Sequence, residues 1–179
     1  MRFCWRCGAR LGAPPPTTCA ACGQEHFHNP LPCGGAIVVR DGRILLLRRA
    51  NEPYRAMWDT PGGFCDGDEH PMHAAERELA EEAGVDGSAT AYVGTWLDVY
   101  GEPAPDGLQL HSLISFYLVD LRDPHAEPVP DGKEITEVGW FDLRALPANL
   151  AFPRHTVPVL RAVREMLDGT GGALPDRTW

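Results

Sequence analysis

Three glutamates stand at helical spacing near the middle of the sequence: Glu78, Glu81 and Glu82. At about 100° per residue on a helix, they would share one arc beside an apolar face. Carboxylates this close repel one another, and the repulsion grows where solvent is excluded. A divalent cation removes that repulsion, and oxygen ligands suit Mg²⁺ or Mn²⁺. The spacing therefore predicts a metal site, although a solvated acidic helix face would show the same spacing.

A glycine-containing loop precedes these glutamates. Gly62 and Gly63 carry no side chain, so their backbone can approach a metal or a phosphate closely. Arg77 can pair with Glu69, and we expect this structural salt bridge to hold the loop against the helix. This context favours the metal site over the solvated face.

The N-terminal segment carries a second constellation that can hold a metal. Its cysteines form two Cys-x2-Cys pairs, Cys4 with Cys7 and Cys19 with Cys22, separated by eleven residues. Such pairs can place four thiolates around one Zn²⁺, and the spacing predicts a zinc ribbon over residues 1–28. Because four cysteines leave no open coordination position, the zinc should be structural. The ribbon would serve as a folding or dimerisation staple, or alternatively as a contact for RNA or substrate phosphates.

Composition limits the classes of function that remain. The 179 residues are 44% hydrophobic with a net charge of −9, which suits a globular protein and argues against general binding of nucleic acid. No apolar run approaches the roughly 20 residues of a membrane helix, and the N-terminus lacks the apolar stretch of a secretory signal. We therefore expect a cytoplasmic protein with reduced cysteines.

Two helices are predicted from periodicity and breaker residues. The first covers Pro71–Ala83, begins near Asp68 or His70 and ends at Gly84. The second covers Thr156–Leu167 and is amphipathic. The apolar side of the first consists of Met72, Ala75, Leu79 and Ala83, and that of the second of Val159, Val163, Met166 and Leu167.

The strands surround these helices in the chain order. Strands are predicted at residues 34–40, 43–49, 90–99, 109–121 and 135–141. Asp41-Gly42 is a hairpin turn signal between the first two, and residues 51–68 form a long loop with one short strand. The order of strands, helix, strands and helix predicts an α/β (α+β) sandwich in which helices cover a mixed sheet. The glycine-rich end, residues 169–179, is expected to be flexible.

One segment resembles a known family motif. The pattern is Gly63-x5-Glu69-x7-Arg77-Glu78-Leu79-x-Glu81-Glu82-x-Gly84-Val85, which resembles the Nudix box at every fixed position. The resemblance implies a Nudix α/β/α sandwich over about residues 33–168. It also implies hydrolysis within a diphosphate, with water as the nucleophile and Mg²⁺ as the usual cofactor.

The same resemblance implies roles for single residues. Glu78 and Glu82 correspond to metal ligands, and Glu82 is also a candidate catalytic base. Glu81 corresponds to a further ligand or to the base that activates water. The carbonyl of Gly62 would add a ligand. Members of the family often take another carboxylate from a later loop.

Two glutamates stand where that later carboxylate is expected. Glu134 precedes the strand that contains a tryptophan and is the first candidate for fourth ligand or base, with Glu137 as the alternative. Both would otherwise be ordinary polar residues. For the nucleoside end, the candidates are Trp58, Phe64, Trp96 and Tyr100, although aromatic residues more often pack in a core.

A ribbon followed by a Nudix domain resembles the NADH pyrophosphatase family. That family carries a Ser-Gln-Pro-Trp stretch downstream of the box, where this chain has Gly94-Thr95-Trp96-Leu97-Asp98-Val99-Tyr100-Gly101. With this departure and its shorter build, the chain is more similar to the broader hydrolases whose small-molecule nucleotide substrates are ADP-ribose or related ADP compounds. The alternatives are an NAD(H) pyrophosphatase, an NAD-cap RNA decapping enzyme and a non-catalytic nucleotide sensor. Homodimers are common in the family, and a homodimer stays an alternative to a monomer.

Overall fold

The computed structural model describes residues 2–103 and 107–169. The chain forms two compact units, a small N-terminal one, Met1–Pro30, and a larger one, Leu31–Trp179. Most of the predicted flexible tail lies outside the described residues, as does part of the breaker-rich loop after residue 100. Neither helix among the described residues combines the length and the apolar character that crossing a membrane requires.

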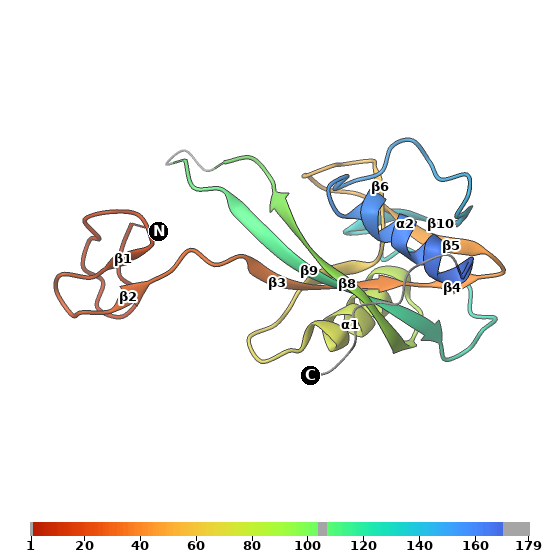
Figure 1. The fold of residues 1–179 in the computed structure, drawn as a ribbon, viewed down its shortest axis with the longest axis horizontal. Coiled ribbons are helices and arrows are strands. Elements are labelled where there is room, and N and C mark those ends of the chain that lie inside the picture. The colour runs from red at the N-terminus through yellow and green to blue at the C-terminus, as the bar shows by residue number, and fades with distance from the viewer. Residues whose placement is uncertain (1, 104–106, 170–179) are drawn as a thin grey trace. The chain divides into compact units, whose positions relative to one another are not determined.

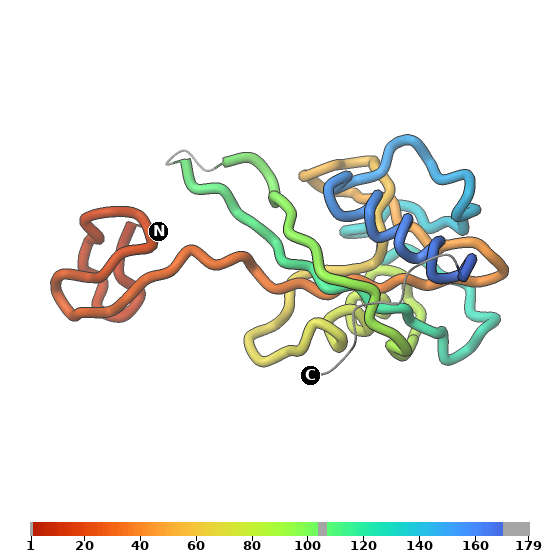
Figure 2. Tube along the Cα trace, viewed as in Figure 1, coloured from red at the N-terminus to blue at the C-terminus, as the bar shows by residue number. Residues whose placement is uncertain are grey.

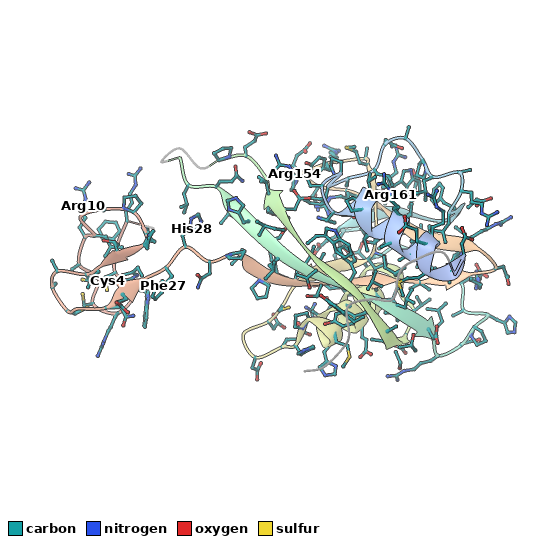
Figure 3. The ribbon with its side chains drawn as sticks, viewed as in Figure 1. Cys4, Arg10, Phe27, His28, Arg154 and Arg161 are labelled. Carbon is teal, nitrogen blue, oxygen red and sulfur yellow. The ribbon has the colours of Figure 1, made fainter. Side chains whose placement is uncertain are left out.

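The N-terminal unit has little regular structure. Strand β1 (Thr17–Thr18) pairs antiparallel with β2 (Glu25–His26), and Phe3 forms an isolated bridge with Arg10. Its buried apolar residues are Cys4, Leu11 and Cys19. In Figure 3, Cys4 lies inside this unit while Arg10 and Phe27 point away from it.

The larger unit contains two four-stranded sheets and two helices (Figure 1). One sheet has the order β7-β3-β9-β8, and in the other β10, β5 and β4 are adjacent and β6 also pairs with β5. Strand β3 is parallel to β9, and the other pairings are antiparallel. The strands are β3 (Leu31–Ile37), β4 (Val39–Arg40), β5 (Arg43–Arg49), β6 (Trp58–Asp59), β7 (Gly62–Phe64), β8 (Gly87–Tyr100), β9 (Leu110–Leu121) and β10 (Ile135–Asp142).

The mixed α/β architecture confirms the predicted fold class, with a difference of detail in the loop before α1. The predicted loop over residues 51–68 holds two short strands, β6 and β7, rather than one. Asp41 and Gly42 have φ values of 51° and 74°, as a tight hairpin between β4 and β5 requires.

The hydrophobic core has two parts, one beneath each helix. In β5, Ile44 and Leu46 belong to the cluster that includes α2 (Thr156–Leu167), whereas Leu45 and Leu47 belong to the cluster that includes α1 (Pro71–Ala83). A strand buried on both faces needs a continuous apolar run, which explains the sequence ILLL. Helix α2 buries Val159 and Val163 as predicted, but Leu167, the last residue, is 52% exposed.

Helix α1 begins and ends as predicted. His70 caps it by accepting a hydrogen bond from the Met72 N–H through Nδ1, and Pro71 occupies the first turn, where a missing N–H does no harm. Gly84 ends it with a φ of 64° and donates to the Ala80 carbonyl. The chain then enters β8 within a few residues, as the tube in Figure 2 shows.

Helix α1 packs directly on the backbone of β3 at Gly34. A Cβ atom there would lie 2.7 Å from the Ala75 nitrogen and would overlap the Pro71 carbonyl. Because the missing side chain lets two backbones touch, the height of α1 above the sheet is fixed by the backbone itself. The carboxylates that α1 carries are therefore held at a defined distance from β3 and β7.

Candidate active site

Glu82 is the most deeply buried carboxylate of α1, with 7% of its surface exposed. The Gly62 N–H donates a hydrogen bond to its Oε2 at 2.9 Å. Burial raises the pKa of Glu82 well above its usual value, and the neighbouring Glu78 raises it further. A buried carboxylate of this kind is stabilised by a cation placed beside it.

Arg77 connects the loop before α1 to two of the three glutamates. Its Nε and Nη2 donate to the two oxygens of Glu69 at 2.9 and 2.8 Å, a bidentate pair. Its Nη1 donates to Glu78 at 2.8 Å and to Glu81 at 3.0 Å, and Nη2 also donates to the Phe64 carbonyl at 3.0 Å. This hydrogen bonding holds the pKa of Glu69 down at about 2.

Glu78 lies against the glycine loop. A Cβ atom at Gly63 would collide with its carboxylate, so the loop comes as close as a residue without a side chain allows. Burial raises the pKa of Glu78, and the nearby Glu81 and Glu134 raise it further, while Arg77 opposes them. The missing side chain at Gly63 thus leaves room for the Glu78 oxygens beside the backbone.

Glu134 reaches the same cavity from the turn before β10. Asp131 organises that turn, because its Oδ1 accepts hydrogen bonds from the N–H groups of Lys133, Glu134 and Ile135 at 2.9–3.1 Å. Burial raises the pKa of Asp131, but these donors outweigh it and the net pKa is lowered. The Asp131 N–H in turn donates to the carbonyl of Glu82, which ties the turn to the end of α1.

These groups surround a cavity of about 320 Å³. Its walls combine the box residues with groups from β3, β5, β6, β8, β9 and the segment before α2. The lining residues are Cys33, Arg49, Asp59, Thr60, Gly62, Gly63, Phe64, Asp66, Arg77, Glu78, Glu81, Glu82, Tyr100, Ser112, Ile114, Glu134, Phe152 and His155. One cavity therefore contains the candidate metal ligands together with aromatic side chains.

An aromatic wall lines part of this cavity. Phe64 and Tyr100 meet edge to face with ring centroids 5.1 Å apart, and Tyr100 stacks on Phe152 at 5.9 Å. The guanidinium of Arg49 lies 5.0 Å above the Phe152 ring and 3.6 Å from Asp59. Flat aromatic faces beside a cation suit a nucleobase next to phosphates.

The other two aromatic candidates lie elsewhere. Trp58 packs edge to face on Phe141 at 4.7 Å, and Trp96 packs on Phe116 at 5.7 Å, both against the core cluster under α2. The Trp96 ring lies so close over Gly94 that a Cβ there would be 2.6 Å from it. Neither tryptophan lines the cavity.

The structure also separates the two later glutamates. Glu137 is exposed and forms an ion pair with Arg48 on β5, whereas Glu134 lines the cavity. Strand alternation and a bulge between Ile135 and Glu137 turn the two side chains to different surroundings.

Several cavity residues were not predicted from the sequence, among them Arg49, Asp59, Phe152 and His155. These four come from three segments that only the fold brings together. Arg49 ends a predicted strand, and the Phe152–His155 segment precedes a predicted helix, but neither carries a motif. Only the expectation that sites gather at the ends of elements could have suggested them.

The oxygen donors around Glu82 fit a divalent cation of the Mg²⁺ type. Glu78, Glu81 and Glu82 offer carboxylates, and Gly62 can add a backbone carbonyl. Burial raises the pKa of both Glu78 and Glu82, and a bound cation would oppose this effect by stabilising the charged carboxylates. The donors are all hard oxygens, as Mg²⁺ and Mn²⁺ prefer.

The four cysteines fit a tetrahedral ion. Their sulfur atoms all lie within 4.8 Å of one another, and the Cys4–Cys22 and Cys7–Cys19 pairs are both 3.7 Å apart. A tetrahedron with Zn–S bonds of about 2.3 Å has edges of about 3.8 Å. The cluster could therefore hold zinc without rearrangement.

Solved structures include close matches to this fold. A NUDIX hydrolase from Nitrosomonas europaea superposes with a TM-score of 0.75 at 27% identity, covering 96% of both chains. Among curated proteins, an ADP-ribose pyrophosphatase from Methanocaldococcus jannaschii is 30% identical over 131 residues, 73% of this chain and 72% of its own.

Two further relatives are longer proteins. The NAD-capped RNA hydrolase NudC from Chromobacterium violaceum is 30% identical over 82% of this chain, and the putative mutator protein MutT4 from Mycobacterium tuberculosis is 32% identical over 76%. This chain spans about half the length of each, 52% and 54% respectively. The NUDIX domain model matches residues 31–162, the part that carries the glutamate helix and its cavity, and the chain belongs to the NUDIX family.

Proposed function

We propose that this protein is a Mg²⁺- or Mn²⁺-dependent hydrolase that cleaves the diphosphate of ADP-ribose or a similar ADP compound. The observation that carries the proposal is the single cavity that joins the carboxylates of α1 to the aromatic wall of Phe64, Tyr100 and Phe152. Such a cavity can take a diphosphate at one end and a base at the other. The similarity to an ADP-ribose pyrophosphatase supports the same substrate class.

Glu78, Glu81 and Glu82, with the Gly62 carbonyl, would hold the cation. A divalent cation bound there supplies charge neutralisation for the diphosphate and acidifies water. Arg49 lies over the Phe152 ring of the aromatic wall, and we assign it to the phosphate that is attached to the nucleoside. The reaction breaks one P–O bond of the P–O–P bridge and adds the elements of water across it.

Glu134 is our choice for the base that takes the proton from the attacking water. It lines the same cavity from the turn before β10, and its carboxylate makes no hydrogen bond within the described residues, whereas Arg77 holds Glu81 at 3.0 Å. A general base must keep an oxygen free for the proton that it removes. Glu81 is the alternative base, and Glu134→Gln and Glu81→Gln variants separate the two.

The zinc assignment in the N-terminal unit is a second part of the proposal. The sulfur geometry fits one Zn²⁺ held by Cys4, Cys7, Cys19 and Cys22, with no position left for a substrate. We assign this ion a structural role. Metal analysis of the purified protein should give about one zinc per chain.

A substrate panel tests the proposed function. ADP-ribose, NADH, NAD⁺, NAD-capped RNA, dinucleoside polyphosphates and nucleoside triphosphates are each incubated with Mg²⁺ or Mn²⁺. We expect AMP to be released fastest from ADP-ribose or another ADP-containing compound. Preference for NAD-capped RNA would favour the activity named for the NudC relative. Tight binding without turnover of any compound would indicate a nucleotide sensor and overturn the proposal.

A further inference from the structure

His155 stacks on Phe152 of the aromatic wall and lines the cavity that the carboxylates of α1 also line. It precedes α2, lines the cavity and is only 4% exposed. Its Nδ1 is 2.9 Å from Oδ2 of Asp98, a residue of β8 that is also buried. Asp98 is itself oriented, because its Oδ1 accepts a hydrogen bond from the Val99 N–H at 2.6 Å. This pair fastens the segment before α2 to β8.

The surroundings of the ring leave one edge for the cavity. Phe152 stacks on one face at 5.3 Å with planes 17° apart, and Phe116 packs at 5.4 Å with planes tilted by 42°. Asp98 occupies the Nδ1 edge. Since His155 lines the cavity and Asp98 takes the Nδ1 edge, the geometry points to Nε2 as the ring nitrogen on the cavity side.

The Asp98 carboxylate beside Nδ1 also favours one tautomer of the His155 ring. Oδ2 of Asp98 lies 2.9 Å from Nδ1 and can only accept, so it favours a neutral ring that carries its proton on Nδ1 and a lone pair on Nε2. Burial lowers the pKa of His155, against the opposing effect of Asp59 and Asp98, and so favours the neutral ring. A neutral Nε2 accepts a hydrogen bond, which suits a hydroxyl group rather than a phosphate oxygen.

The neighbours of His155 indicate which part of a nucleotide would carry this hydroxyl group. On one side, Phe152 belongs to the aromatic wall. On the other side, the adjacent Thr156 donates through Oγ1 to Asp59 at 3.4 Å, and Asp59 precedes the loop of Gly62. In a nucleoside diphosphate, the ribose is the part between base and phosphates.

We propose that His155 is a positioning residue that accepts a hydrogen bond from a ribose hydroxyl of the nucleoside, with Asp98 holding its tautomer. This inference rests on the proposed function, since it needs a nucleoside diphosphate in the cavity. It makes the enzyme selective for ribonucleosides over the deoxynucleoside lacking that hydroxyl.

Kinetics with matched substrates test the proposal. ADP-ribose is compared with analogues whose adenosine lacks the 2′- or the 3′-hydroxyl, for the wild type, His155→Phe and His155→Gln. The wild type should lose roughly 3- to 10-fold in kcat/KM on one analogue, the worth of one hydrogen bond. His155→Phe should lose the same factor on ADP-ribose, mainly through KM, and no longer discriminate. His155→Gln, which keeps an acceptor, should recover part of the discrimination.

The exposed His125 supplies the control, since His125→Phe should leave all rates unchanged. If His155→Phe lowers kcat/KM by one common factor on all three substrates, the residue is merely structural and the proposal is overturned. Retention of full discrimination by His155→Phe overturns it as well.

A second measurement separates this inference from the proposed function. In ¹⁵N-histidine-labelled protein, His155 should be the Nδ1–H tautomer, and Asp98→Asn should change that state. Addition of AMP, which has the ribose but no bond to cleave, should shift the Nε2 resonance. An Nε2–H tautomer, or no shift with AMP, overturns the inference even if ADP-ribose is hydrolysed. The expected tautomer and shift without hydrolysis would overturn only the proposed function.

Discussion

The buried apolar interior of the N-terminal unit is formed by Cys4, Leu11 and Cys19, whereas that of the larger unit fills two clusters, one beneath each helix. Three residues cannot bury enough surface to order a chain segment of this length. We therefore expect the N-terminal unit to need its metal in order to fold. The larger unit has an extensive core of its own, and we expect it to fold without the cation proposed for its cavity.

The candidate metal ligands of the two units also differ in whether their donor atoms are already close together. Among the described residues, the four cysteines are the one group whose donor atoms already converge within 4.8 Å. The glutamates of α1 are instead engaged by Arg77 and by the Gly62 N–H. The proposed zinc site would thus bind its ion without rearrangement, whereas a cation at the proposed catalytic site would have to draw the glutamates away from other partners.

Removal of zinc should have the largest effect and should stay within one unit. Cys4→Ser or a strong chelator should unfold the N-terminal unit, because zinc binding contributes about 10–16 kcal/mol in small zinc domains. Hydrogen exchange would show loss of protection before residue 30, and the thermal midpoint of the larger unit should not change. Cys65→Ser is the matched control. Unfolding of both units together would contradict the comparison.

Glu82→Gln should separate catalysis from stability in the larger unit. Loss of a ligand or base should lower kcat at least about 100-fold. The thermal midpoint without added metal should stay equal or rise at neutral pH, because the amide removes a buried ionisable group whose pKa is raised by burial. Glu137→Gln, on an exposed ion pair, is the control and should keep full activity. A lower midpoint for Glu82→Gln would show that this carboxylate serves the fold.

Arg77→Lys tests whether the loop needs a bidentate partner. A lysine cannot form both bonds to Glu69, so the free energy of unfolding should fall by about 1–3 kcal/mol. Urea denaturation at fixed metal concentration measures the change. Arg144→Lys breaks an exposed pair with Asp168 and should change the free energy by less than about 1 kcal/mol. Equal effects of the two substitutions would refute the special role of Arg77.

Lowering the pH should reveal a smaller contribution of the Arg77–Glu69 pair to the free energy of unfolding. The folded-state pKa of Glu69 is about 2, below the value of about 4.3 expected in the unfolded chain. Its stabilising contribution is therefore complete above pH about 4.3 and is lost as pH falls toward 2. Urea denaturation between these pH values should show a shallower loss of stability for Glu69→Gln than for the wild type. Parallel curves would contradict the assignment.

Local sequence rules were enough for most of the fold. Both helices have their predicted bounds, because Pro71, Gly84 and the apolar spacing act within a few residues. The short strand β7 was missed since its pairing partner, β3, lies far away in the sequence.

The candidate site likewise has residues that could be predicted from the sequence and residues that could not. Residues of the motif, such as Glu69 and Arg77, lie within one helical neighbourhood and could be placed from spacing alone. Arg49 and His155 reach the cavity through tertiary packing, which no local pattern encodes. Trp58 and Trp96 show the converse case, since a large aromatic side chain has the same appearance in a sequence whether it packs in the core or faces a ligand.

The bare backbone contact at Gly34 has a consequence for redesign. Any larger residue there would lift the helix and carry all of its carboxylates away from the glycine loop as one rigid body. The distance between the glycine loop and the proposed glutamate ligands could therefore be changed at a position that is not itself a proposed ligand. Graded substitutions at Gly34, with compensating trims at Ala74, offer a route to retune ion preference from beneath the site.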